Sequence, residues 1–217
     1  MSTAGTVYRL AICDLDGTLV DTSHDLAHAV NQTRKELGLC PLETAEVVSY
    51  VGNGMRRLVE RSFAGHPALI PVALEALERH YRACQTSAVS LYPGVRETIE
   101  ILFERGVLLA VLTNKPQVSA EAVLSHVGLR RFFGRVYGDD GQRPLKPDPS
   151  SVGQILCETG VARQDCLLVG DSAVDIECAH AAGVFSVFVE GGMGRPHEVL
   201  RPGYSASCLS DILTLWD

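Results

Sequence analysis

Leu10–Leu19 has the sequence LAICDLDGTL, and the expected fold and site both begin from this stretch. Its first four residues are apolar, as in a short buried strand, and Asp14 and Asp16 follow directly. Side chains two positions apart in an extended chain point the same way, so both carboxylates can face one site. In parallel sheets, ligands bind beyond the carboxyl ends of the strands. The stretch therefore predicts a strand that ends at a functional site.

From residue 93 onward, the chain alternates amphipathic helices with short apolar runs. Helices are expected over Val95–Glu104, Val118–Val127, Ser150–Glu158 and a segment through Ala182, each with a glycine close to its end. Strands are expected over Val107–Leu112, Cys166–Val169 and Val184–Val189. Such alternation is typical of a parallel sheet whose two faces are covered by helices. We therefore predict an α/β fold.

The segment between Thr22 and Leu91 differs, because it is expected to be helical throughout. Three apolar helical faces support this, and their residues are Leu26, Val30, Thr33 and Leu37, then Met55, Leu58, Val59 and Phe63, then Leu74, Leu77 and Tyr81. Pro71 is well placed to begin the third helix. We predict an α/β core formed by residues 1–21 and 92–217, with residues 22–91 inserted as an α-helical cap.

Polar side chains follow the other predicted strands of the core. The set consists of Thr113 and Asn114 after the strand ending at Leu112, Asp171, Ser172 and Asp175 after the strand ending at Val169, and Lys146 in the loop before the Ser150 helix. Because parallel strands end at the same edge of a sheet, we expect these side chains to converge with Asp14 and Asp16.

This combination of side chains suits phosphoryl transfer. Clustered carboxylates repel one another, and a magnesium ion, which prefers oxygen ligands, would offset their charge. A phosphate would then be held between cation, hydroxyl, amide and ammonium groups. A carboxylate such as Asp14 can attack phosphorus and form an aspartyl-phosphate, while Asp16 can give a proton to the leaving alcohol.

The same residues resemble four motifs of the haloacid dehalogenase superfamily of phosphohydrolases. The matching segments are DLDGTL from Asp14, Thr113-Asn114, Lys146-Pro147-Asp148 and Gly170-Asp171-Ser172 with Asp175, in the order that the family has. Further segments resemble its phosphoglycolate phosphatase branch, namely Val51–Gly54, Leu91–Val95 and Thr113–Pro116. Glu190–Arg195 departs from the tyrosine- and asparagine-bearing segment that many close relatives carry there. The resemblance implies a Rossmann-like core and the helical cap.

The resemblance also implies a role for each motif residue. Asp14 is expected as nucleophile, Asp16 as acid and base, and Lys146 as a catalytic and phosphate-binding ammonium. Thr113 and Asn114 are expected to bind phosphate. Asp14, Asp171 and the backbone carbonyl of Asp16 are expected to bind Mg²⁺. Asp175 and Ser172 are expected to support the site, and Gly52, Asn53 and Gly54 are expected to form a substrate loop of the cap.

Structural explanations exist for several of these residues taken singly. Asp16-Gly17 is a common turn pair, Asp171 before Ser172 can cap a helix, and Lys146 can be a solvated loop lysine. All three would have to hold together, so the catalytic interpretation is favoured. Asp139, Asp140 and Asp148 are interpreted as turn and cap residues.

Two further pairs invite a functional interpretation and are expected to be surface residues. His24 and His28 have the spacing of helical zinc ligands but no evident third ligand. Arg56 and Arg57 are interpreted as a solvated helix face, with contact to a substrate carboxylate as the alternative.

Composition limits the class of partner. The net charge of −7 and the absence of a basic run argue against nucleic acid and anionic membranes. No apolar stretch approaches membrane-spanning length, and the seven cysteines show no metal or disulfide spacing. We expect a cytoplasmic protein, monomeric or homodimeric, that acts on a small phosphorylated metabolite.

The site residues and the resemblance predict a magnesium-dependent phosphomonoester hydrolase, and the resemblance implies 2-phosphoglycolate as the leading substrate. The alternatives are a phosphatase for a sugar phosphate or for pyrophosphate, and a binding module that kept the fold without the chemistry. A phosphomutase is less favoured because the cap shows no clear set of groups to grip a phosphorylated intermediate. A dehalogenase is less favoured because halide departure needs no proton from Asp16.

Overall fold

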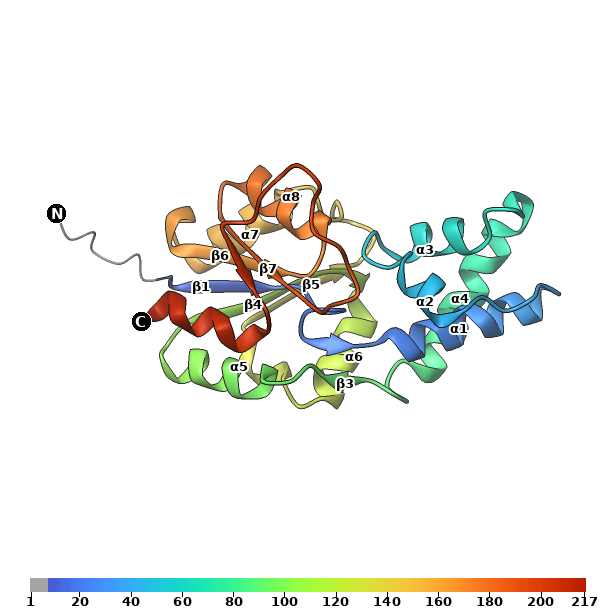
Figure 1. Cartoon of the computed structure of the whole chain (residues 1–217), viewed down its shortest axis with the longest axis horizontal. Helices are drawn as coiled ribbons and strands as arrows, with labels where there is room; N and C mark the ends of the chain where they lie inside the picture. The colour runs from blue at the N-terminus through green and yellow to red at the C-terminus, as the bar shows by residue number, and fades with distance from the viewer. Residues whose placement is uncertain (1–7) are drawn as a thin grey trace.

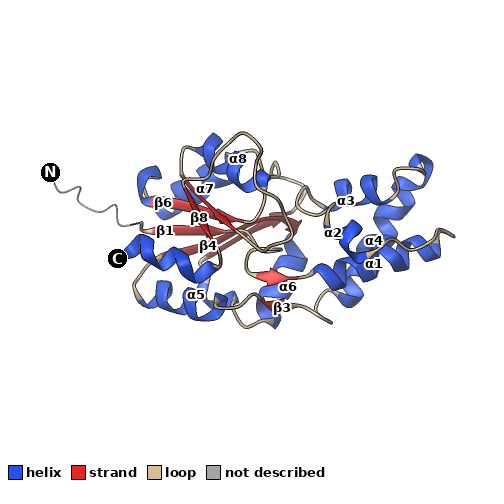
Figure 2. Ribbon diagram, in the orientation of Figure 1, coloured by secondary structure: helices blue, strands red, loops and turns tan. Residues whose placement is uncertain are grey.

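A six-stranded parallel sheet forms the larger body of the protein, whose computed structural model describes residues 8–217 (Figures 1 and 2). The strand order is β5-β4-β1-β6-β7-β8. The bounds are β1 Leu10–Cys13, β4 Leu108–Pro116, β5 Arg135–Asp139, β6 Cys166–Gly170, β7 Phe185–Val189 and β8 Tyr204–Ala206. The predicted α/β fold is confirmed.

The central strand β1 is buried because neighbouring strands and helices cover it on every side. It pairs in parallel with β4 and with β6, so that Cys13 lies opposite Val111 and Val169. Ala11 and Cys13 contribute to the hydrophobic cluster on one face of the sheet, and Leu10 and Ile12 contribute to the cluster on the other. This alternation places the end of β1 in the middle of the sheet's carboxyl edge.

Helices cover both faces of the sheet, as the alternating sequence predicts. Helices α5 (Val95–Glu104) and α6 (Gln117–His126), with the 3-10 segment η4 (Leu209–Trp216), pack on one face. Helices α7 (Ser150–Thr159) and α8 (Ala173–Ala182) pack on the other. Gly160 and Gly183 end α7 and α8 in the left-handed region, which glycine adopts without steric cost. Short 3-10 turns, η2 (Arg130–Phe132) and η3 (Arg163–Asp165), precede β5 and β6.

A separate group of helices lies beyond the carboxyl ends of the strands (Figure 1). These helices are α1 (Ser23–Glu36), α2 (Thr44–Val48), α3 (Met55–Ser62) and α4 (Ile70–Cys84), with the 3-10 turn η1 (Pro67–Leu69) before α4. They bury their own hydrophobic cluster, which includes Leu26, Val30, Leu58, Leu77 and Tyr81 from the predicted faces. Below we call this group the cap; the domain boundaries at residues 21/22 and 91/92 stay a prediction.

A short ribbon joins the two parts. Strands β2 (Val20–Asp21) and β3 (Ser90–Leu91) pair antiparallel, with Val20 opposite Leu91. The prediction that the segment up to Leu91 is helical throughout is therefore wrong at its end. Ser90 and Leu91 pair with the chain that enters the cap, a long-range contact that local periodicity does not contain.

Two differences concern the sheet itself. Strands β5 and β8 were not among the predicted strands, and β4 continues to Pro116 instead of ending at Leu112. The extension follows from a register shift between Leu112 and Pro116, after which Pro116 pairs with Asp139 of β5. Thr113 and Asn114 consequently lie within the strand. In the part of the chain that the structure describes, no helix has the length and apolar character needed to cross a membrane.

Candidate active site

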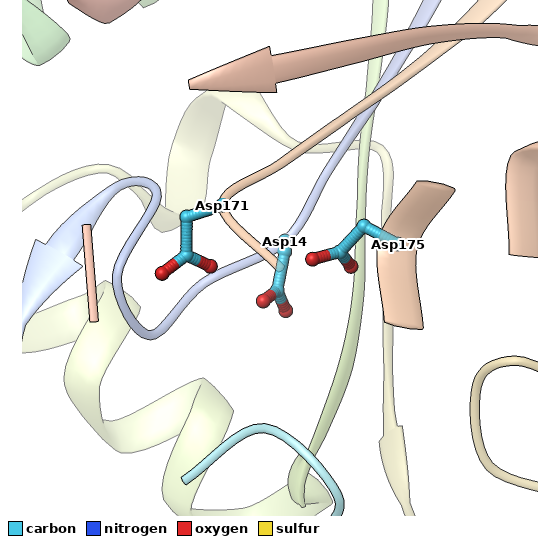
Figure 3. Close-up of side chains that lie close together, drawn as sticks. All are labelled: Asp14, Asp171 and Asp175. Atoms are coloured by element: carbon cyan, nitrogen blue, oxygen red, sulfur yellow. The ribbon is translucent and has the colours of Figure 1, made fainter. Parts of the chain in front are cut away.

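Three buried aspartates meet at the carboxyl edge of the sheet. Asp14 follows β1, Asp171 follows β6, and Asp175 lies in the first turn of α8. One oxygen from each carboxylate lies within 4.8 Å of the others, and Figure 3 shows Asp14 between Asp171 and Asp175. The backbone N–H of Asp14 donates to the carbonyl of Val169 at 2.8 Å, which continues the sheet to the site. The expected convergence of these residues is present.

Lys146 supplies positive charge to this group. Its Nζ lies 2.8 Å from Asp14 Oδ1 and 2.6 Å from Asp175 Oδ1. The side chain is 3% exposed, so the solvated-loop interpretation of Lys146 does not hold. Lys146 therefore contacts both Asp14 and Asp175. Its single positive charge offsets only one of these two carboxylate charges.

Asp171 is enclosed by backbone. The N–H of Gly194 donates to its Oδ2 at 2.7 Å, and Thr18 Oγ1 donates to its Oδ1 at 3.4 Å. A Cβ on Gly17 would lie 2.0 Å from Asp171 Oδ2, and one on Gly192 would lie 2.4 Å from the same atom. Both glycines thus allow backbone to approach the carboxylate where a side chain would collide.

The electrostatics of the group suit a divalent cation. Burial raises the pKa of Asp14 to about 6, against the lowering effect of Lys146. Burial, then the charges of Asp14 and Asp175, raise the pKa of Asp171 to about 7. Among the described residues, Asp14 Oδ1 is buried and has the Lys146 ammonium, 2.8 Å away, as its cationic neighbour. A bound divalent cation would remove each of these costs, because it supplies positive charge to oxygen ligands.

Ser172 and Asp175 organise the start of α8. The backbone N–H and the hydroxyl of Ser172 both donate to Asp175 Oδ2, at 3.1 and 2.6 Å. The carboxylate of Asp175 therefore caps the helix with one oxygen and contacts Lys146 with the other. Among the described residues, the Asp171 side chain accepts bonds from Gly194 and Thr18 and does not cap α8.

The Asp16 carboxylate bonds to residues outside the group of three aspartates. Lys115 Nζ lies 2.8 Å from its Oδ1 and 3.0 Å from its Oδ2, and Thr22 Oγ1 donates to Oδ1 at 2.8 Å. Burial lowers the pKa of Lys115, but the charge of Asp16 outweighs that effect and holds the pKa above its usual value. The Asp16 carboxyl is thus held by a charged lysine on the side of the cap.

Thr113 and Asn114 differ in their surroundings. The Thr113 hydroxyl is buried and accepts a bond from the N–H of Lys115 at 3.3 Å. The Asn114 amide donates to the carbonyls of Gly52 and Lys146 at 3.0 Å each and accepts from the N–H of Lys146 at 2.8 Å. The Asn114 side chain therefore bonds both the Lys146 loop and the cap loop, and its phosphate-binding role stays a prediction.

A cavity separates the site from the cap and holds about 480 Å³ of empty space, including its open mouth. Core residues on its wall include Asp14, Asp16, Thr113 and Lys115, and cap residues include Gly52, Gly54, Met55, Leu58 and Tyr81. Asn53 is not on the wall; its Oδ1 accepts a bond from Arg61 at 2.8 Å. Of the predicted cap loop, the two glycines therefore face the cavity and the asparagine side chain turns away.

Comparison with known proteins agrees with this arrangement. The family model for haloacid dehalogenase-like hydrolases matches residues 11–189. The chain belongs to this family. A phosphoglycolate phosphatase from Pseudomonas putida is 38% identical over 91% of this chain and 76% of its own length. One from Agrobacterium fabrum is 37% identical over 84% and 81%. The crystal structure of a predicted phosphoglycolate phosphatase from Haemophilus somnus superposes with a TM-score of 0.91 at 28% identity, covering 97% of this chain and 98% of that chain.

Other residues singled out in the sequence of this hydrolase have structural surroundings. Asp139, Asp140 and Asp148 each accept a bond from a backbone N–H two residues on, which confirms their interpretation as turn and cap residues. His24 and His28 are exposed on α1. Arg56 and Arg57 are exposed and pair with Glu60, as expected of a solvated helix face.

Several residues of the hydrolase site were missed by sequence reasoning. Lys115 contacts Asp16, Tyr81 accepts a hydrogen bond from Lys115, and Gly192 and Gly194 pack against Asp171. The signal for Lys115 was its place directly after Thr113 and Asn114 in a strand-end motif. The signal for the two glycines was their place soon after β7, because ligands bind at the loops that follow the carboxyl ends of parallel strands. Tyr81 gave no signal beyond its apolar helical face.

Proposed function

We propose that this family member is a magnesium-dependent phosphomonoester hydrolase that acts on 2-phosphoglycolate. The observation that carries the proposal is the pair of carboxyl groups at the end of β1. Asp14 is buried beside Lys146 and Asp171, while Asp16 faces the cavity under the cap. A phosphate next to Asp14 would thus have its ester oxygen on the side of Asp16.

The proposed reaction has two steps. Asp14 attacks phosphorus, the bond to the ester oxygen breaks, and the leaving alcohol takes a proton from Asp16. Water then gives a proton to Asp16 as its oxygen attacks phosphorus, which releases phosphate and restores Asp14. Lys146, the Thr113 hydroxyl and backbone N–H groups of the strand end would bind the phosphate oxygens.

The donor set fits Mg²⁺, which would lie against Asp14, Asp171 and the backbone carbonyl of Asp16. When bound, it would neutralise the carboxylates and polarise the phosphate. Asp175 would support the site indirectly, because one of its oxygens holds Lys146 and the other holds the start of α8.

The size of the cavity supports a small substrate. Even with its open mouth included it holds only about 480 Å³ of empty space, and two cap glycines bring backbone onto its wall. Both relatives described above carry the name phosphoglycolate phosphatase. A sugar phosphate or pyrophosphate remains the alternative substrate, and retention of Asp14, Asp16 and Asp171 argues against a non-catalytic binding module.

The decisive test measures phosphate release from 2-phosphoglycolate, a sugar phosphate, pyrophosphate and p-nitrophenyl phosphate, each with Mg²⁺ and with EDTA. We expect activity that needs Mg²⁺ and the highest kcat/KM for 2-phosphoglycolate. Asp14→Asn is the matched control, since it keeps the size of the side chain and removes its charge. Phosphate release by that variant at the wild-type rate would contradict the mechanism, and a higher kcat/KM for another ester would contradict the substrate.

A further inference from the structure

We propose that His197 is a positioning residue, which closes a turn in the loop after β7, holds that loop against α8 and so keeps the Gly194 N–H on the Asp171 carboxylate. The loop comprises residues 190–203, between β7 and β8, and passes beside α8 in Figure 1. Below we call it the β7–β8 loop. The proposal rests on the proposed function, in which Asp171 binds Mg²⁺.

The middle of the β7–β8 loop has few attachments to the rest of the core. Both ends of the loop are hydrogen-bonded to strands of the sheet. In the described part of the chain, hydrogen bonds and ion pairs join residues 191–200 to other elements at two points. One is the bond from Gly194 to Asp171, and the other is the contact of His197 with Glu177. The contact of His197 is therefore the second support of the segment that reaches Asp171.

The His197 ring uses its two nitrogens for different tasks. The backbone N–H groups of Val199 and Leu200 both donate to Nδ1, at 3.0 and 2.8 Å. Because two donors converge on Nδ1, this nitrogen is the acceptor and carries no proton. The proton of the neutral ring is then on Nε2, which lies 3.2 Å from Glu177 Oε1 on α8. One side chain thus closes a turn in the loop and joins that turn to a helix.

Helix α8 is the element against which Gly194 must fit. Asp171 stands directly before Ser172, the residue that caps α8. A Cβ on Gly194 would lie 2.6 Å from the carbonyl oxygen of Asp171 and 2.7 Å from Ser172 Cβ. A loop joined to Glu177 further along the same helix therefore keeps its distance from this end of α8. Movement of the loop toward α8 is blocked by contact, and movement away from α8 breaks the Gly194 bond.

The Gly194 bond determines how the Asp171 carboxylate is turned. The N–H donates to Oδ2 at 2.7 Å, whereas the Thr18 hydroxyl donates to Oδ1 at the longer distance of 3.4 Å. The shorter bond fixes Oδ2 and leaves Oδ1 with the greater capacity to accept a cation. Hydrogen bonds of this kind orient metal ligands and tune metal affinity. Loss of the His197 contacts should therefore weaken Mg²⁺ binding although every proposed ligand is still present.

The test measures Mg²⁺ binding by isothermal titration calorimetry, and exchange of the Gly194 amide proton by NMR in the metal-free protein. His197→Leu removes both contacts of the ring. We expect it to weaken Mg²⁺ binding by about 10-fold, the lower end of the effect of supporting groups. Exchange of the Gly194 amide should become about 10-fold faster, as for the loss of about one hydrogen bond. At saturating Mg²⁺, kcat should stay near the wild-type value.

His197→Asn separates the turn from the contact with α8. Asparagine Oδ1 is bonded to Cγ, as histidine Nδ1 is, so it can accept from the same two N–H groups and close the turn. The shorter side chain does not reach Glu177. We therefore expect a loss of Mg²⁺ affinity that is measurable but smaller than in His197→Leu.

Glu177→Met tests whether Glu177 acts through His197. It should weaken Mg²⁺ binding by about 3-fold in the wild-type background and have no further effect in the His197→Asn background, because residues that share one interaction are not additive. Glu198→Met is the matched control. Glu198 is exposed, has no hydrogen bond or ion pair among the described residues, and carries the same charge beside His197. Its replacement should change neither Mg²⁺ affinity nor exchange.

Four results would overturn the proposal. They are an unchanged Mg²⁺ affinity in His197→Leu, equal losses in His197→Leu and His197→Asn, a loss from Glu177→Met that persists in the His197→Asn background, and a fall in kcat that saturating Mg²⁺ does not restore. A wild-type protein that binds no Mg²⁺ would contradict the proposed function instead. The exchange rate of the Gly194 amide would then decide the role of His197, and equal rates in wild type and His197→Leu would refute it.

Discussion

Replacing Gly192 by alanine tests how closely backbone must approach Asp171. The added Cβ would lie 2.4 Å from both Asp171 Oδ2 and the carbonyl oxygen of Gly17. Each of the two neighbours would have to move by about 1 Å to reach an ordinary contact of about 3.5 Å. Asp171 is 2% exposed, so it has no open space into which to turn. The substitution therefore acts on the position of a proposed metal ligand without changing its chemistry.

Metal sites tolerate displacements of only about 0.2 Å in ligand distance, and disturbing the supporting groups typically costs 10- to 100-fold in affinity. We expect Gly192→Ala to raise the Mg²⁺ concentration for half-maximal phosphate release by about 10- to 100-fold. The assay is a Mg²⁺ titration of initial rates at saturating substrate, with isothermal titration calorimetry for binding alone.

Gly153→Ala is the matched control for this variant. Gly153 lies in α7, is exposed, and has open space where its Cβ would be. The control should keep the wild-type Mg²⁺ requirement and stabilise the fold by about 0.5–1 kcal/mol. An unaltered Mg²⁺ titration for Gly192→Ala would refute the reasoning, because it would show that the Asp171 carboxylate can shift without loss of metal.

Three other predictions concern the nucleophile, the cap loop and pH. Asp14→Asn should lower kcat by several orders of magnitude while circular dichroism shows an intact fold, and near-normal turnover would contradict a covalent mechanism. Gly54 has φ +87° and a Cβ there would lie 2.9 Å from Leu145, so Gly54→Val should lower kcat/KM for 2-phosphoglycolate more than for p-nitrophenyl phosphate. Equal losses on the two substrates would mean that the loop does not contact the leaving group. The raised pKa values of Asp14, about 6, and Asp171, about 7, mean that the metal-free fold binds more protons than the unfolded chain, so its stability falls as pH rises toward 8. Mg²⁺ competes with those protons, so the rise in Tm that it causes should be larger at pH 8 than at pH 6. Differential scanning fluorimetry measures this difference, and an equal rise at the two pH values would contradict the prediction.

The parts of the fold that were predicted are those with strong local patterns. Strand β1 is four apolar residues before two aspartates, and α5 has an apolar face that ends near a glycine. The structure has both at the predicted residues. The convergence of Asp14, Lys146 and Asp171 was also predictable, because the topology of a parallel sheet brings the ends of its strands to one edge.

The parts that were missed depend on contacts between distant residues. Strand β5 contains Arg135, Gly138 and Asp139, so it lacks the apolar signal of a buried strand and is defined by its pairing with β4. Tyr81 and Lys115 are 34 residues apart and meet only when the cap lies on the core. No local pattern contains either contact.

The β2–β3 ribbon brings the two ends of the cap to one place. Val20 and Leu91 are direct partners, and so are Asp21 and Ser90, so the chain leaves and re-enters the core across a gap of about 5 Å. Because the two ends of the cap lie so close together, a hairpin turn or another inserted domain could replace the cap without moving a strand of the sheet. The two residue pairs of the ribbon thus mark the point along the chain where the strand-end residues proposed for the chemistry give way to the cap residues proposed to contact the substrate.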